Sequence, residues 1–406
     1  MTTAEGTHAP VVTTVAVPDP GALLDGLPVP GALAWVREGD GLVGWGEAAR
    51  AEFRGPGRFR QAQAWWQRYL AAVAVVDEVG VPGSGPVAFG SFAFDDAGAS
   101  VLVVPRHVVG RRDSRSWRTT IGPAPSITAM EPVTAPRGLR YRTALHAPAG
   151  WRAAVADAVR RIHAGQLGKV VLAKAVDAQA ETPVDPRWLL ARLADRYGDC
   201  WTFAVDGLVG ATPELLVRRL GTEVRSRVLA GTITRGDDAQ EDHLLAQALA
   251  TSSKDLDEHR FAVDSVTASL RECCSEVTAS APYLLPLANV QHLATDVRGR
   301  VADEASALDL VAALHPTAAV AGTPTRDALA VIAELEDVDR GRYAGPVGWL
   351  DAAGDGEWGI ALRCAALDGD RLRLYAGCGI VGESDPEAEA AEWEAKLLPI
   401  RQALTV

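Results

Sequence analysis

The sequence predicts an α+β fold. Short apolar segments separated by Gly and Pro, such as GALAWV, LVGWG and GPVAFGSFAF, are typical of strands, and segments with helical spacing of apolar residues lie among them. These strands and helices follow no regular βαβ order, which favours α+β over a doubly wound parallel sheet. A chain of 406 residues with 48% hydrophobic content can also bury a large core.

The first part of the chain has the weaker pattern. Residues 1–12, rich in Thr, Ala, Gly and Pro, are expected to be disordered, and the first part of the fold is expected over residues 13–148. Strands are predicted between residues 31 and 105, with a helix near 59–79 interrupting them. Residues 110–148, rich in Arg, Ser and Pro, are expected to form an irregular connection.

The pattern is sharper over residues 149–406. Apolar residues at positions 151, 155, 159 and 162 predict a helix, followed by the strand KVVLAKAV and a helix near 188–197. The strands WTFAV and LVGATPELLVRR precede a long helix expected from about 237 to 273. Beyond it we expect the strand ANVQHLATDVRG, helices near 305–314 and 327–335, three strands (GPVGWLD, EWGIALRCAAL and RLRLYAGCGIV) and a C-terminal helix.

Composition and charge argue against several classes of protein. A formal net charge of -12 disfavours sequence-independent binding to nucleic acid or to an acidic membrane, since both need a basic face. No apolar run reaches the roughly 18 residues of a membrane span, and the first residues lack a signal-peptide pattern, so a cytoplasmic location is expected. The five cysteines show no C-x-x-C spacing, so we expect reduced core residues and no disulfide framework or zinc site.

Two acidic stripes stand at helical spacing far apart in the chain. Asp255 and Glu258 form the first, and Glu389, Glu392 and Lys396 form the second. Spacings of three and four residues place each set on one helical face, so the two stripes could converge on one hard cation such as Mg2+. The lysine could then reach an anion beside the cation. Each stripe alone is also typical of a solvated helix surface.

An amine and a carboxyl group offer acid–base chemistry. Alternation along KVVLAKAV puts Lys169 on one face of the strand and Lys174 on the other. Lys169 is either solvent-facing or held against an apolar wall, where its pKa would fall and the amine could act as a base. Glu214 is either an exposed turn residue or a buried carboxyl with a raised pKa, able to act as a general acid.

Other local features are less specific. The segment LAGTITRG, with Gly231 and Thr232, is either a site of close backbone approach to a ligand or a plain loop before a helix. His292 and His315 stand alone, and a lone histidine is most often structural. The sequence contains no G-x-S-x-G, H-E-x-x-H or C-x-x-C motif, so serine hydrolase, zinc protease and thiol redox chemistry have no starting point.

Nine segments, taken in order, resemble the chorismate-utilising enzymes, the family that includes isochorismate, salicylate and anthranilate synthases. They are KVVLAKAV, GATPELLVRR, LAGTITRG, SSKDLDEHRFAVD, HLATDVRG, LHPTAAVAGTPTRDA, GPVGWLDAAGDGEWGIALRCA, RLYAGCGIV and EWEAK, and they cover roughly residues 151–401. The resemblance implies a single large domain of antiparallel-rich sheets packed as a sandwich, with helices outside. It also implies chorismate as substrate and Mg2+ as cofactor.

Within this family the chain is most similar to isochorismate synthases. The lysine of KVVLA is the water-activating base of the branches that add water, which points to Lys169. The form HPTAAVAG, with Ala319 facing the ligand, resembles isochorismate synthases, whereas salicylate and anthranilate synthases tend to carry Thr there.

The resemblance also assigns binding roles. It implies that Glu258 and Glu392 ligate Mg2+ and that Asp255 and Glu389 hold its water shell. Substrate-binding roles fall to Arg363 and Lys396 at the carboxylates and to Gly231, Thr232, His292, Ala319, Tyr375 and Gly377 around them.

The chain departs from the family pattern in two places. Trp393 follows Glu392 directly, which makes Glu394 a rival ligand, although Glu394 falls off the helical face shared by Glu392 and Lys396. The basic loop after LAGT is also thin, with Arg235 alone.

The expected reaction is isomerisation of chorismate to isochorismate, with Lys169 as base and Glu214 as acid. A salicylate synthase, which goes on to eliminate pyruvate, is the alternative in the same family; an ammonia-using synthase fits less well with Lys169. An inactive relative acting as a binding protein is the alternative of another class. We expect a monomer, and the sequence leaves open whether menaquinone, a catechol siderophore or a salicylate-derived metabolite is the downstream product.

Overall fold

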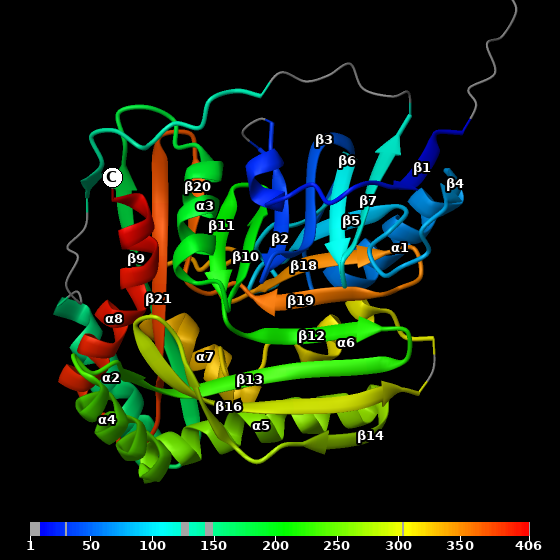
Figure 1. The fold of residues 1–406 in the computed structure, drawn as a ribbon. Coiled ribbons are helices and arrows are strands. Elements are labelled where there is room, and N and C mark those ends of the chain that lie inside the picture. Colours follow the sequence, from blue (N-terminus) through cyan, green and yellow to red (C-terminus); the bar gives the residue numbers. More distant parts are fainter. Residues whose placement is uncertain (1–8, 29–30, 123–129, 143–148, 303, 406) are drawn as a thin grey trace, which may run out of the picture.

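The computed structural model describes residues 9–28, 31–122, 130–142, 149–302 and 304–405 (Figure 1). The disorder expected for residues 1–8 lies outside this range. Strand β1 (Val11–Ala16) begins inside the segment expected to be disordered, because VVTTVA pairs on both sides with other strands.

In the first sheet, eleven strands of the described residues pair one after another. In spatial order they are β4 (Ala74–Asp77), β1, β7 (Arg115–Ile121), β6 (Ser100–Arg112), β3 (Asp40–Phe53), β2 (Leu33–Arg37), β10 (Trp201–Val205), β11 (Leu208–Thr212), β20 (Cys364–Asp368), β21 (Arg371–Ile380) and β9 (Lys169–Gln179). The short strands β8 (Arg140–Tyr141) and β17 (Gly322–Thr323) pair with the other edge of β9. All these pairings are antiparallel except that of β1 with β4.

The second sheet branches from the same long strand. Residues 107–112 of β6 pair with β7, whereas residues 101–103 pair with β5, so β6 belongs to both sheets. From β5 (Val87–Ser91) the pairings continue through β18 (Pro346–Asp351), β19 (Gly356–Ile360), β12 (Leu215–Leu220), β13 (Glu223–Thr234) and β16 (Val290–Val301) to β14 (Cys274–Ala279) and β15 (Tyr283–Pro286). In Figure 1, β12, β13 and β16 run across the lower half of the view, whereas β9 and β21 stand upright at their left.

The helices pack on these two sheets. Helices α2 (Ala149–His163) and α7 (Thr325–Leu335) contact β9, α8 (Pro386–Leu404) contacts β21, and α3 (Pro186–Arg196) contacts β10, β11 and α8. Helices α4 (Ala239–Thr251) and α5 (Ser253–Cys273) lie on β13 and β16, α6 (Ala307–Leu314) on β12 and β19, and α1 (Arg58–Ala71) on β3. A short 3-10 helix, η1, spans Leu23–Gly26. The predicted α+β class, with antiparallel-rich sheets in one domain, is confirmed.

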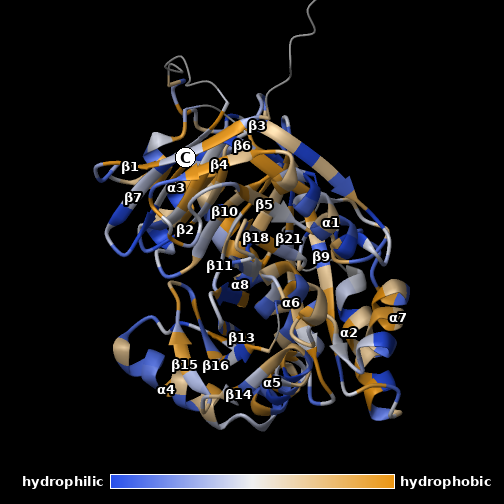
Figure 2. Cartoon of the chain, turned by 90° about the vertical axis from the view of Figure 1, so that its right-hand side faces the viewer, coloured by the Kyte–Doolittle hydropathy of each residue, from blue (hydrophilic) through white to orange (hydrophobic). Residues whose placement is uncertain are grey.

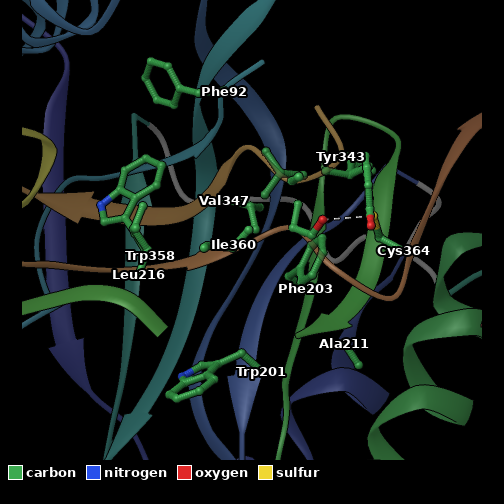
Figure 3. Close-up of a cluster of buried hydrophobic side chains, with 14 of the residues drawn as sticks. Phe92, Trp201, Phe203, Ala211, Leu216, Tyr343, Val347, Trp358, Ile360 and Cys364 are labelled. Carbon is green, nitrogen blue, oxygen red and sulfur yellow. Dashed lines mark hydrogen bonds between the residues drawn. The ribbon is translucent and has the colours of Figure 1, made fainter. Parts of the chain in front are cut away.

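The core lies where the two sheets face each other. Figure 3 shows part of it, with Phe203, Leu216, Val347, Trp358 and Ile360 buried together from strands of both sheets. The surface helices are amphipathic: α7 turns Ala328, Val331 and Ile332 inward, and Figure 2 shows hydrophobic and hydrophilic stretches along it. No helix in the described ranges is long and apolar enough to cross a membrane.

Several expectations for individual elements were wrong in detail. LVGATPELLVRR and EWGIALRCAAL, each expected as one strand, are two strands each, β11 with β12 and β19 with β20. The segment 110–148 is not wholly irregular, since β6 and β7 form a hairpin and β8 follows. The helix expected over 59–79 ends at Ala71 and β4 follows it. The helix expected over 237–273 is two helices, because Ser252 adopts an extended conformation and its side chain accepts a hydrogen bond from the backbone N–H of Asp255, which caps α5. Of the two interpretations of LAGTITRG, the plain loop is wrong for residues 229–234, which end β13, and only Arg235 and Gly236 lie beyond the strand.

All five cysteines are free, as expected. Four are buried and Cys273 is partly exposed.

Candidate active site

A pocket lies beside β9 and β21, where residues from both sheets and from α5 and α8 come together. Among the predicted site residues, Glu214, Gly231, Thr232, Glu258, His292, Ala319, Arg363, Tyr375, Gly377 and Lys396 line it. The other four predicted residues, Lys169, Asp255, Glu389 and Glu392, do not line the pocket. Each of these four lies against a residue that lines the pocket or against another of the four.

Lys169 is fully buried at the start of β9. Its Nζ lies 3.2 Å from Oε1 of Glu258, and it makes no regular hydrogen bond to another described residue. Strand β17 pairs with β9 at this position, with Thr323 opposite Lys169. Of the two interpretations of this lysine, the solvent-facing one is excluded, and the amine is held in the protein interior beside one carboxylate.

Glu214 follows Pro213 in the turn between β11 and β12 and is 4% exposed. Burial raises the pKa of Glu214 to about 8, although the backbone N–H of Leu229 and the charges of Lys169 and Lys396 act to lower it. The carboxyl group is therefore mostly protonated at neutral pH. A protonated, buried carboxyl in a pocket can donate a proton to a ligand.

Glu258 points from α5 into the pocket. Burial acts to raise the pKa of this carboxyl, but Lys169, Lys396 and Lys254 together hold it below its ordinary value. Glu258 is therefore a buried, ionised carboxylate. Two of these lysines also pair with acidic residues of α8, Lys254 with Glu389 and Lys396 with Glu392.

Glu389 is buried at the first turn of α8. Its Oε1 accepts hydrogen bonds from Nζ of Lys254 at 2.7 Å and from Oγ of Ser384 at 2.8 Å. Its Oε2 is buried without a hydrogen bond to any described residue. Burial and the nearby Glu392 raise the pKa of Glu389 to about 7. Sequence reasoning missed Lys254, although it stands four residues before Glu258 on α5 and hence on the same helical face.

Glu392 and Lys396 pair along α8, with Nζ of Lys396 2.6 Å from Oε1 of Glu392. Nζ of Lys396 also donates a hydrogen bond to the carbonyl of Gly377 at 3.3 Å. The rival ligand Glu394 lies near Arg152 on α2, because the pKa of that guanidinium is raised mainly by its hydrogen bond to Glu387 and also by the charge of Glu394. Glu394 therefore belongs to the side of α8 that faces α2, whereas Glu392 belongs to the site.

The two acidic stripes meet, and their residues fit a divalent cation. Burial raises the pKa of Asp255, and the charges of Glu258 and Glu392 add to this, so carboxylates of α5 and α8 repel one another at short range. Carboxylate oxygens of Glu389 and Glu392 also lie within 4.8 Å of each other. Oxygen donors of this kind suit Mg2+, and a bound cation would relieve their repulsion.

Arg363 is held in place by a polar chain. It is buried at a left-handed backbone position (φ 47°) between β19 and β20, and its Nη2 donates to Nε2 of His292 at 2.7 Å. On the other side of the ring, Nδ1 of His292 lies 3.1 Å from Oγ1 of Thr232. Burial and the adjacent Arg363 lower the pKa of His292 well below its ordinary value, so the ring is neutral and Nε2 accepts. This fixed guanidinium can bind a carboxylate.

Glycines form one wall of the pocket because side chains would not fit there. A Cβ on Gly379 would lie 2.1 Å from Oε1 of Glu258, and one on Gly377 would lie 2.8 Å from the carbonyl of Leu172. Gly231 has a φ of 78° at a β-bulge of β13 and passes close to Asp255. Gly379 was not predicted as a site residue. Since it follows Gly377 by two residues, strand alternation puts both on the same face, and this could have indicated it.

Two further pocket residues escaped sequence reasoning. Tyr343 stacks on Tyr375 with ring centroids 5.1 Å apart, and burial raises the pKa of Tyr375 to about 12, so this phenol stays neutral. Arg340 reaches the pocket wall and donates to the backbone carbonyls of Val320 and Val171. His315, by contrast, donates a hydrogen bond from Nε2 to the carbonyl of Phe94 at 2.9 Å, which fits the structural role expected for it.

Comparison with known proteins identifies the family of this chain. The model of a family described as chorismate binding enzyme matches residues 35–129 and 126–405. The chain is 37% identical over 412 residues to the salicylate biosynthesis isochorismate synthase of Pseudomonas aeruginosa, covering 92% of this chain and 84% of the relative. It is 37% identical over 337 residues to isochorismate synthase DhbC of Bacillus subtilis, covering 80% and 82%.

A solved structure is similar over nearly the whole chain. The menaquinone-specific isochorismate synthase MenF of Escherichia coli superposes with a TM-score of 0.80 at 26% identity, covering 98% of this chain and 95% of that one. The resemblance noted in the nine sequence segments is thereby confirmed. By its fold, its matched residues and its relatives, this chain belongs to the chorismate-binding enzyme family.

Proposed function

We propose that this protein is an isochorismate synthase, which converts chorismate to isochorismate by adding water at C2 and releasing the C4 hydroxyl. Two observations carry the proposal: a buried amine, Lys169, lies against the pocket residue Glu258, and a buried, protonated carboxyl, Glu214, lines the pocket. The relatives described above support it, since all three are named isochorismate synthases.

Lys169 and Glu214 supply the two proton transfers. Lys169 removes a proton from the water that attacks C2, and Glu214 gives its proton to the C4 hydroxyl as that group leaves. The ring double bonds shift between these two events, so no net proton is gained or lost. The ion pair with Glu258 holds Nζ of Lys169 at 3.2 Å from that carboxylate.

The substrate carboxylates have cationic partners on the opposite side. Arg363 and Lys396 are the proposed carboxylate ligands, and the backbone at Gly231 and Gly377 can approach the ligand closely. Thr232 and His292 hold Arg363 in position through the polar chain described above. Tyr375 and Ala319 line the pocket and limit its shape.

Mg2+ is the proposed cofactor. When bound, it would polarise the ring carboxylate and withdraw charge from the ring. Glu258 and Glu392 would be its direct ligands, and Asp255 and Glu389 would hold its water shell through their remaining oxygens.

The test is incubation of the purified protein with chorismate and Mg2+, followed by chromatographic identification of the products. Isochorismate in a reversible equilibrium with chorismate is the expected result. Salicylate together with pyruvate, formed without a partner enzyme, would replace the proposal by a salicylate synthase. Amination of chorismate by ammonium salts would place the protein in the ammonia-using branch. No turnover and no Mg2+-dependent binding of chorismate by calorimetry would indicate an inactive relative.

A further inference from the structure

The proposed Mg2+ site contains a thiol that the reaction does not need. Cys378 stands on β21 between Gly377 and Gly379 and is fully buried. Its Sγ lies within 4.8 Å of carboxylate oxygens of both Glu389 and Glu392, and these three ligand atoms form one group. The one hydrogen bond of the thiol, among the described residues, is a long contact of 3.5 Å to the carbonyl of Glu389.

A second observation points to a ligand at the same place. Glu389 is 1% exposed, and Lys254 and Ser384 both bind its Oε1. Its Oε2 is left buried with no hydrogen bond to a described residue. A buried, unpaired carboxylate oxygen is costly, so an ion that binds it would be stabilised by that oxygen.

Sulfur changes which ions this group prefers. Oxygen ligands suit Mg2+, whereas a thiolate favours softer ions such as Zn2+, Cd2+ and Co2+. Zinc binds sulfur at about 2.3 Å and carboxylate oxygen at about 2.0–2.2 Å, so two of its ligands stand roughly 3.6 Å apart. The present separations, all within 4.8 Å, therefore exceed this ligand spacing by at most about 1 Å.

We propose that Cys378, Glu389 and Glu392 form a thiolate–carboxylate site for a thiophilic divalent cation, which competes with Mg2+. On binding, the S–H bond breaks, the proton leaves to solvent, and a metal–sulfur bond replaces it. The competition follows because Glu389 and Glu392 also belong to the proposed Mg2+ site, and in this respect the inference rests on the proposed function. It makes Zn2+ an inhibitor of the protein.

An optical titration tests the site without chorismate. Co2+ added to the reduced, metal-free protein is expected to give a thiolate-to-metal charge-transfer band that saturates at about one equivalent. Zn2+ at one equivalent is expected to remove the band, and a large excess of Mg2+ to weaken it. The variants Cys378→Ala and Cys378→Ser are both expected to lose it. Cys273→Ala, which removes the most exposed cysteine, is the matched control and keeps the band.

Three results would overturn the inference: no band in the wild-type protein, a band that persists in a folded Cys378 variant, or a band that Mg2+ never weakens. Circular dichroism on each variant separates loss of the site from loss of the fold. The titration contains no substrate, so a protein that binds Co2+ through Cys378 but leaves chorismate unchanged would refute the proposed reaction and leave the metal site intact. In an active protein, Zn2+ is expected to inhibit the wild type at least about tenfold more strongly than Cys378→Ala.

Discussion

Replacing Glu214 by Gln tests whether this carboxyl is held protonated. Gln has the shape of a protonated Glu and cannot ionise, so it should fit the buried turn without a charge. Since burial raises the pKa of Glu214 from 4.5 to about 8, the folded protein binds this proton more tightly than the unfolded chain does. This tighter proton binding stabilises the folded protein. The stabilisation is complete at pH values below 4.5, the pKa of this group in the unfolded chain, and is lost as pH rises toward 8.

The size of the effect follows from the two pKa values. A shift from 4.5 to about 8, at about 1.36 kcal/mol per pH unit, corresponds to an upper figure of about 5 kcal/mol. The free energy of unfolding of the wild type should therefore fall more steeply than that of Glu214→Gln as pH rises from about 5 to about 8, by up to that amount.

Urea unfolding at a series of pH values measures the difference in free energy of unfolding between the two proteins. Turnover measured on the same samples shows the effect of the substitution on catalysis. We expect Glu214→Gln to lower turnover by about 10²- to 10⁴-fold while remaining folded. Parallel stability curves for the two proteins would show that Glu214 ionises normally in the folded state. Near-normal turnover of the variant would exclude Glu214 as the general acid.

Three further changes test the other parts of the site. Lys169→Gln should lower turnover by about 10²- to 10⁴-fold with the pocket still able to bind chorismate by calorimetry, and a variant with unchanged kcat would exclude Lys169 as base. Gly379→Ala should lower kcat by roughly 10²-fold, because its Cβ would displace the Glu258 carboxylate, whereas Gly150→Ala, where no atom lies within 4 Å, should be unaffected; equal activity of the two variants would contradict the geometry. Glu258→Gln should raise the Mg2+ concentration for half-maximal activity, and an unshifted Mg2+ titration would exclude it as a ligand.

Much of the fold could be predicted because hydrophobic spacing differs between helices and strands. The errors occurred where a local feature interrupts a continuous pattern. Nothing in apolar periodicity separates α4 from α5, since the break depends on the Ser252 side chain capping the backbone of Asp255. The hairpin of β6 and β7 was missed because the Arg and Ser residues of β7 are typical of a loop, although side chains between them such as Trp117 and Thr119 are buried.

The site was predictable in its parts but not in its pairings. Helical spacing identified Glu258 and Glu392 as members of two stripes, and no rule of spacing could show that the stripes meet. The partners that hold them, Lys254 on Glu389 and Lys169 on Glu258, depend on how α5, α8 and β9 pack together. The need for a glycine at 379 is likewise visible only once the Glu258 carboxylate lies against β21.

The central claim is that α5 and α8 share one divalent cation, and calorimetric titration of Mg2+ into four proteins tests it most directly. These are the wild type, Glu258→Gln, Glu392→Gln and the double variant. We expect one Mg2+ per chain in the wild type, severe weakening in each single variant, and little further loss in the double variant, because both residues bind the same ion. Independent losses that add in the double variant, or a second Mg2+ per chain, would contradict the claim.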